Sequence, residues 1–137
     1  MDVKAVAEEI AEKLDAIAGL RAFGYPPGAL PLPGAIVALP DDITFDETYG
    51  RGSDAITLPV FVLVARGDDR AAVLELLPYL SGSGTKSVKS AVDSTNANTY
   101  TECDTVTVTR ATTGAYVYNA VESLGAEFTV YVTGSGS

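Results

Sequence analysis

The segment from Ile56 to Ala65 places the strongest constraint on the fold, because almost all of its residues are apolar and valine recurs at alternate positions. An unbroken apolar run rich in β-branched residues is typical of a strand that is covered on both faces. The run is too short to cross a membrane, which takes about 20 apolar residues. Pro59 cannot donate a ladder hydrogen bond, so we expect a bulge or an edge in the first half of this strand. The rest of the chain must therefore supply layers that cover a sheet.

The first such layer is an amphipathic helix predicted over residues 2–18. Its apolar residues recur at spacings of three and four, which places them on one face of a helix. They are Val3, Val6, Ile10, Leu14 and Ile17. Asp2 is placed to cap the first turn, and Gly19 is placed to adopt the left-handed conformation that ends many helices.

Two more helices are expected in the middle of the chain. The spacing predicts a helix over 70–80, in which Pro78 should kink or end the last turn. Its inward-facing residues would be Val73, Leu74, Leu77 and Leu80. After a flexible joint at 81–84, a short helix is predicted over 85–92, capped by Ser83 or Thr85.

The remaining pattern predicts strands. They are expected over 35–39, 104–110, 116–121 and 126–132, with a turn at Gly114 and a proline-rich connector before the first. In the last strand Ala126, Phe128, Val130 and Val132 alternate with polar residues. The order of elements favours an α+β fold, a mostly antiparallel sheet with the helices packed on one face. We predict a single domain over residues 1–133, followed by a flexible tail at 134–137.

The composition argues against an enzyme. The chain has no histidine, which is the commonest general base, and Cys103 is its only cysteine. Acid–base chemistry would depend on carboxylates, lysine or tyrosine. We therefore expect no catalytic residues, no metal site and no cofactor. No apolar signal segment follows Met1, so we expect assembly in the cytoplasm and no membrane partner.

Three short motifs have better structural interpretations. Residues 82–87 resemble a phosphate-binding loop, but Thr85 stands where that motif needs glycine, so they are interpreted as a joint between helices. Arg66-Gly67-Asp68 spells an adhesion tripeptide but falls at a strand-to-helix turn. The acidic residues of 41–54 do not have the spacing of a calcium loop.

Residues 41–54 instead suggest an acidic arm. This segment contains Asp41, Asp42, Asp46, Glu47 and Asp54 together with Tyr49 and one base, Arg51. We expect a long hairpin with its tip near residues 50–53. The chain carries a net charge of −9, which disfavours gripping nucleic acid through its phosphates.

Several stretches, taken in order along the chain, resemble tail terminator proteins of long-tailed (siphovirus-type) bacteriophages that infect actinobacteria. They are Gly19-Leu20-Arg21 with Tyr25-Pro26-Pro27, Pro33 to Val37, Thr48 to Gly52, Leu58 to Val64, Asp68 to Ala72, Tyr79 to Gly84 with Ser87-Val88-Lys89, and Leu124 to Val130. The resemblance covers most of the chain, although residues 94–102 match nothing in the family.

The resemblance implies a structural protein of the virion. Such a protein forms a homo-hexameric ring at the head-proximal end of the tail, ends polymerisation of the tail tube protein and contacts a head-completion (stopper) protein. DNA passes through the lumen of the ring without specific binding. We expect the acidic arm to face that lumen or a neighbouring subunit, so replacing Asp46 and Glu47 with lysine should slow DNA passage.

Ring formation also needs surfaces that pair between copies. The strand edges at Leu58, Val60, Thr129 and Tyr131 are the candidates. The alternatives left open are a stopper protein, a tail tube subunit or, from other classes, a small cytosolic binding domain or a carboxylate-dependent enzyme.

Overall fold

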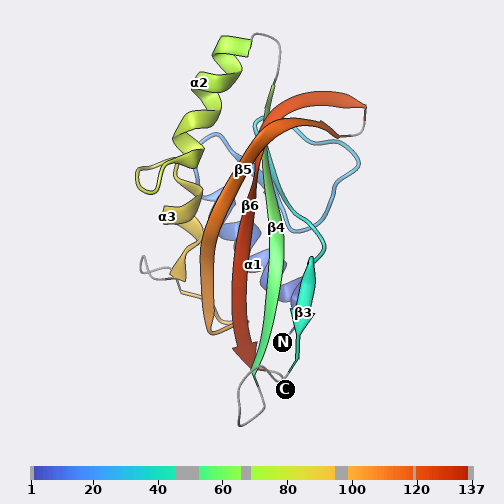
Figure 1. The fold of residues 1–137 in the computed structure, drawn as a ribbon, viewed down its shortest axis with the longest axis vertical. Coiled ribbons are helices and arrows are strands. Elements are labelled where there is room, and N and C mark those ends of the chain that lie inside the picture. Colours follow the sequence, from blue (N-terminus) through green and yellow to red (C-terminus); the bar gives the residue numbers. More distant parts are fainter. Residues whose placement is uncertain (1, 46–52, 66–68, 95–98, 119, 136–137) are drawn as a thin grey trace.

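A computed structural model of the chain describes residues 2–45, 53–65, 69–94, 99–118 and 120–135 (Figure 1). The elements follow in the order α1 (Val3–Asp15), β1 (Arg21–Phe23), β2 (Gly34–Val37), β3 (Asp42–Thr44), β4 (Ser53–Ala65), α2 (Asp69–Leu80), α3 (Val88–Val92), β5 (Thr105–Tyr118) and β6 (Val121–Ser135). The predicted α+β class is confirmed.

The six strands form one mixed sheet in the order β1-β2-β4-β6-β5, and β3 pairs with β4 beyond the end of β2. The β1–β2 pair is parallel and the other four pairs are antiparallel. All three helices supply residues to one core on one side of this sheet. The prediction of a mostly antiparallel sheet with helices on one face is thereby confirmed.

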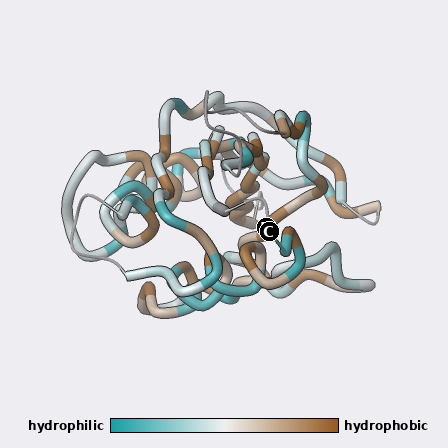
Figure 2. Tube along the Cα trace, turned by 90° about the horizontal axis from the view of Figure 1, so that it is seen from below, coloured by the Kyte–Doolittle hydropathy of each residue, from teal (hydrophilic) through white to brown (hydrophobic). Residues whose placement is uncertain are grey.

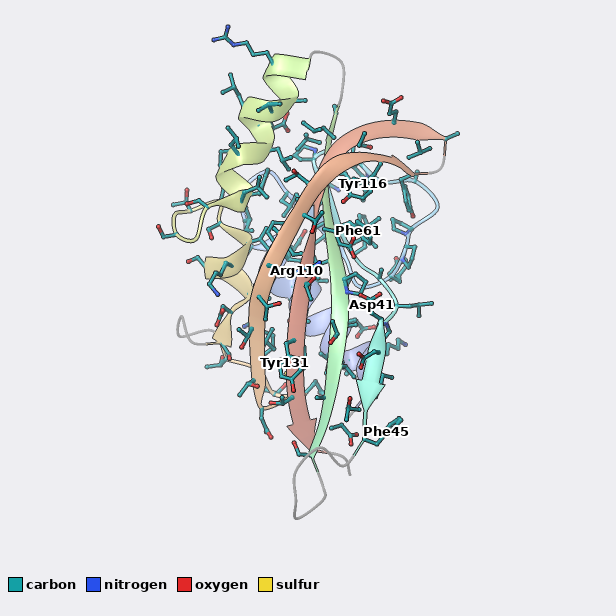
Figure 3. The ribbon with its side chains drawn as sticks, in the orientation of Figure 1. Asp41, Phe45, Phe61, Arg110, Tyr116 and Tyr131 are labelled. Carbon is teal, nitrogen blue, oxygen red and sulfur yellow. The ribbon has the colours of Figure 1, made fainter. Side chains whose placement is uncertain are left out.

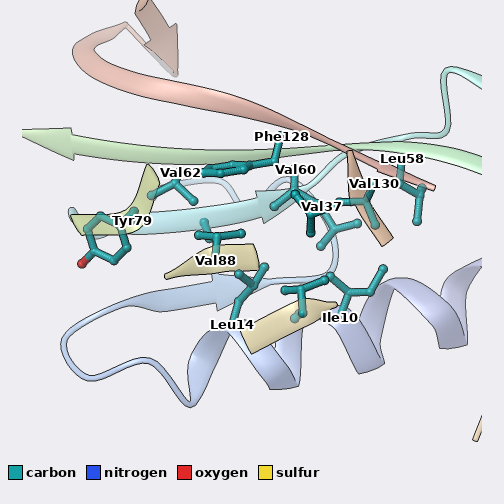
Figure 4. Packing of buried hydrophobic residues seen from close by; sticks show 14 of the residues in the cluster. Ile10, Leu14, Val37, Leu58, Val60, Val62, Tyr79, Val88, Phe128 and Val130 are labelled. Carbon is teal, nitrogen blue, oxygen red and sulfur yellow. The ribbon is translucent and has the colours of Figure 1, made fainter. Parts of the chain in front are cut away.

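Helix α1 forms where the apolar spacing predicted it. Val6, Ile10 and Leu14 are fully buried. The Asp2 carboxylate accepts a hydrogen bond from the Ala5 amide, which is the predicted cap. Gly19 has φ +83°, also as predicted, in the turn that leads to β1. Figure 4 shows Ile10 and Leu14 beneath the sheet residues that they cover.

Strand β4 lies in the centre of the sheet, and Pro59 is accommodated there because its neighbour strand changes at this point. Val37 in β2 pairs with Val60, and Asp42 in β3 pairs with Thr57. The carbonyl of Pro59 accepts a hydrogen bond from the Ala38 amide, on the side where the chain crosses from β2 to β3. Proline lacks the N–H that would complete this pair with Ala38, and neither β2 nor β3 pairs with β4 at this residue. Pro59 sits at a local edge, and no bulge is needed.

The C-terminal third of the chain differs from the prediction. Instead of three strands with a turn at Gly114, it forms two long strands, β5 and β6, joined near Ala120, which has φ +67°. Gly114 lies opposite Gly125 in the middle of this hairpin. The strands continue through the glycines because Tyr116 packs beside them: a Cβ on Gly125 would lie 3.3 Å from the Tyr116 ring. The last strand is also longer than predicted, since Gly134 and Ser135 of the expected tail pair with β4.

Helix α2 is rotated relative to the prediction. Ala72, Leu76 and Tyr79 are buried, whereas the predicted inward residues Val73, Leu74 and Leu77 are 43%, 59% and 52% exposed. Of the predicted set, only Leu80 packs against the core. Both sets have helical spacing, so the pattern alone does not decide between them.

Helix α3 begins later than predicted. Its cap is Ser87, whose hydroxyl accepts a hydrogen bond from the Ser90 amide and donates one to the Ser81 carbonyl. Neither Ser83 nor Thr85 caps it.

Candidate functional surface

One face of the sheet is turned away from the helices. In its lower half in Figure 1, where β3 and the start of β4 lie, this face is lined mainly by hydroxyl side chains. The register places threonines from four strands on this face. This threonine face consists of Thr44, Thr57, Thr105, Thr107, Thr129 and Thr133. Tyr131 lies among them (Figure 3), and the hydroxyls of Thr105 and Thr133 share a hydrogen bond. The register also places two charged residues of opposite sign on this face, Asp42 on β3 and Arg110 on β5, with β4 and β6 between them.

In its upper half the same face is covered by the proline-rich connector. Leu63 is buried although it points away from the helices. The Phe61 and Tyr116 rings meet edge to face at 5.5 Å (Figure 3), and the Tyr118 hydroxyl donates a hydrogen bond to the Pro27 carbonyl. The prediction that this strand is covered on both faces is thus correct for the upper half, where a loop and the curled hairpin replace a second helical layer.

An apolar cavity of about 240 Å³ lies under this cover. It is lined by Pro26, Ile36, Ala38, Phe61, Leu63 and Tyr116 to Tyr118. Its lining has no carboxylate, lysine or arginine. Such a cavity can hold an apolar group, and the tyrosines Tyr116 and Tyr118 are the ionisable residues in its lining.

The predicted pairing edges at Leu58, Val60, Thr129 and Tyr131 are wrong. Leu58 and Val60 lie in β4, which is paired on both sides, and their side chains are in the core. Thr129 and Tyr131 lie in β6, which is held between β4 and β5. The alternation of β6 is as predicted, but strands inside a sheet have no free main-chain groups for another copy.

The predicted acidic arm is described only at its base. Strand β3 pairs antiparallel with the start of β4, as a hairpin requires. Asp41 and Asp42 are exposed there, whereas Asp54 is buried and is not part of a solvated acidic surface. Asp46, Glu47, Tyr49 and Arg51 lie outside the described residues.

The outer edge of the sheet is β5, and its first half is closed by side chains. The Ser94 hydroxyl both accepts from the Val106 amide and donates to the Val106 carbonyl, at 3.1 Å each. The Lys89 ammonium donates to the Val108 carbonyl while it is also paired with Asp93 at 2.7 Å. A bulge follows between Val108 and Arg110. Beyond the bulge, no strand of the described chain pairs with the outer edge. Sequence reasoning missed this edge and noted residues 94–102 only as a stretch without a match in the resembled family.

Exposed apolar side chains occur on α2, around β3, at Tyr25 and beside the β5–β6 connection at Val117 and Val121. On α2 they are Val73, Leu74 and Leu77, which we call the α2 patch. Around β3 they are Leu39, Ile43 and Phe45, which are 83%, 40% and 70% exposed and which we call the β3 patch. Figure 1 places α2 and β3 on opposite sides of the sheet, and Figure 2 shows hydrophobic stretches at the periphery as well as inside.

The surroundings of Glu9 and Cys103 shift the pKa values of these two side chains. Burial raises the pKa of Glu9, but the amides of Thr101 and Glu102 and the Thr101 hydroxyl, all donating to its carboxylate, lower the pKa by more. Burial, and then the charges of Glu9, Asp104 and Glu102, raises the pKa of Cys103 to about 12.

Metal-binding and membrane-spanning features were also sought. Within the described ranges no group of three or more His, Cys, Asp or Glu is arranged to hold a metal ion. None of the helices described is long and apolar enough to cross a membrane.

No protein-family model matches the chain, and no curated protein matches it.

Proposed function

We propose that this chain is a tail terminator of a long-tailed phage, a structural virion protein that caps the head-proximal end of the tail tube. The sequence stretches given above support this, because they follow the order of that family over most of the chain. The observation that carries the proposal is the placement of the chain's unpartnered surfaces. They are an uncovered sheet face and two apolar flanks, which suit a subunit that works by repeated contacts.

The proposed ring holds six copies and lets DNA pass. The threonine face is the surface that we assign to the lumen. Its hydroxyl groups carry no charge, so the phosphates of passing DNA are neither strongly attracted nor strongly repelled there. The acidic total of the chain disfavours tight DNA binding elsewhere. On this proposal the chain is no enzyme and needs no cofactor, and its partners are the tail tube protein and a stopper protein.

The test is a tube-capping assay. Purified cognate tail tube protein is allowed to polymerise with and without this chain, and tube ends and lengths are recorded by negative-stain electron microscopy. We expect a ring of density at one tube end and an arrest of growth at that end. Growth that continues unchanged would reject the proposal. Tubes formed by this chain alone would identify it as a tube subunit, and binding only to head-side proteins would identify a stopper.

A second candidate function, binding of a small apolar ligand, is favoured by the cavity between Phe61, Tyr116 and the proline-rich connector. It is tested by thermal shift with a set of short aliphatic and aromatic alcohols. A ligand that raises the melting temperature of the wild type but not of Phe61→Ala would support this reading. No shift with any member of the set would reject it for that class.

A further inference from the structure

We propose that copies of this chain associate head to tail, with the β3 patch of one copy seated against the α2 patch of the next. This inference rests on the proposed function and gives its ring a specific interface. The starting observation is that each patch is exposed on its own copy. Leu39 and Phe45 on one flank and Leu74 on the other are more than half exposed. Exposed apolar side chains that lie together mark sites of association.

The relative position of the two patches decides the kind of association. A two-fold dimer uses the same patch on both copies, whereas a ring needs two different patches that fit each other. In Figure 1 α2 lies at the upper left of the sheet and β3 at the lower right, and Figure 3 shows Phe45 pointing outward at that lower flank. One copy can therefore receive a neighbour on each side at the same time.

The charges beside the two patches differ in net sign. Next to the β3 patch Asp41 and Asp42 are exposed, and Lys4 lies beside Leu39. On the α2 side Arg70 and Lys86 are exposed and Glu75 is half-buried, and the Lys86 ammonium lies 5.9 Å from the centre of the Tyr79 ring. Because the chain has 18 acidic and 9 basic residues, like copies repel unless cations meet acids at the contact. This complementarity favours a second copy as the occupant over an unrelated apolar partner.

The surroundings of the α2 patch suit an extended segment such as β3. A groove of about 200 Å³ lies between the end of α2 and β5, lined among others by Leu80, Gly82, Arg110 and Ala111. The groove adjoins Val108, the last residue of the β5 edge whose carbonyl is hydrogen-bonded by Lys89. From Ala111 onward no strand of the described chain pairs with this edge.

The experiment uses one substitution in each patch of the full chain. Phe45→Glu spoils the β3 patch and Leu74→Glu spoils the α2 patch. Both side chains are largely exposed, so neither change should prevent folding, which circular dichroism checks. Val121→Glu is the matched control, because it makes the same kind of change at a residue that is 53% exposed but is the first residue of β6, outside both patches.

Sedimentation velocity over a concentration series gives the readout. We expect the wild type and Val121→Glu to self-associate, and each patch variant alone to stay monomeric because its dissociation constant rises by about 100-fold. A mixture of the two patch variants should form one-to-one dimers with near wild-type affinity, since one intact patch of each kind remains. A mixture of Phe45→Glu with the double variant should not.

Three results would overturn the interface. The first is a wild-type protein that stays monomeric at about 1 mM, a concentration at which even weak contacts are detected. The others are a patch variant that assembles like the wild type, and a mixture of Phe45→Glu with Leu74→Glu that stays monomeric. Loss of assembly in Leu74→Glu alone would indicate a two-fold contact through α2 instead. The tube-capping assay with wild-type protein is independent, so capping without head-to-tail association would reject only the interface, and association without capping would reject only the function.

Discussion

At the scale of single residues, some polar side chains hold together segments that are far apart in the sequence. Glu9 is the clearest case. Its carboxylate accepts hydrogen bonds from the amides of Thr101 and Glu102 at 2.9 and 2.7 Å, and so ties helix α1 to a segment more than 90 positions later. Lys13 of the same helix lies over the Tyr100 ring at 5.4 Å. These contacts join α1 to the segment that precedes β5.

Glu9→Gln should destabilise the protein by about 1 kcal/mol at pH 7, because a charged acceptor is replaced by a neutral one at a partly exposed site. The pKa of Glu9 is lowered in the folded state. A lowered carboxyl pKa contributes stability above the unfolded value, near 4.5, and this contribution is lost as the pH falls through the folded pKa. Urea unfolding of both proteins should therefore show a difference at pH 7 that closes by about pH 3. A gap that persists at low pH would contradict the electrostatic account.

Cys103 should be inert in the folded protein. It is buried, and its pKa is raised to about 12 by burial and by neighbouring carboxylates, so almost no thiolate exists at pH 8. We expect iodoacetamide to label the native protein at least about 100-fold more slowly than the urea-unfolded protein. Mass spectrometry of timed samples measures both rates. Equal rates would show that the sulfur is reachable in the native state.

At the scale of elements, the β5–β6 hairpin depends on a close approach at one glycine. A Cβ added to Gly125 would lie 2.5 Å from a Leu63 methyl and 2.6 Å from the Val62 carbonyl oxygen. The Val62 oxygen belongs to the backbone, so it cannot move away by a change of side-chain rotamer. Gly114, directly opposite, has only the Tyr116 ring at 4.0 Å.

Gly125→Ala should therefore cost about 1–3 kcal/mol of stability, the range expected for an overpacked site. Gly114→Ala is the matched control and should change stability by no more than about 0.5 kcal/mol, as for an unhindered surface position. Denaturation midpoints in urea compare the two. If both variants lose the same stability, backbone freedom and not crowding is the reason for the glycines.

At the scale of the whole molecule, the uncovered sheet face determines what an assembly would present to its lumen. If the threonine face lines the channel, a basic substitution there repeats around the ring. Thr107→Arg, at a half-buried position of this face, should make assembled caps retain DNA in a filter-binding assay at low salt and release it as salt rises. Wild-type caps should retain little. DNA retention that is unchanged by Thr107→Arg would place another face toward the channel.

Local sequence pattern predicted the elements whose residues allow one arrangement. Helix α1 has one apolar stripe, so its buried face followed from spacing alone, and the long apolar run of β4 had to be interior. The inward alternation of β6 was equally plain, because Phe128 and Val130 alternate with polar residues. In each case the apolar residues of the local pattern are the residues that the folded protein buries.

Tertiary structure alone decided the rest. Helix α2 has apolar residues on more than one side, so only packing against β4 and β6 selected Ala72, Leu76 and Tyr79 for the core and left Leu74 outside. Strand neighbours are set by contacts between segments far apart in the chain, and for that reason the expected edges at Leu58 and Thr129 became interior strands while β5 became the edge. Gly114 was predicted to form a turn, yet it pairs with Gly125, whose neighbours Tyr116 and Leu63 fill the space beside it, and a continuous hairpin results.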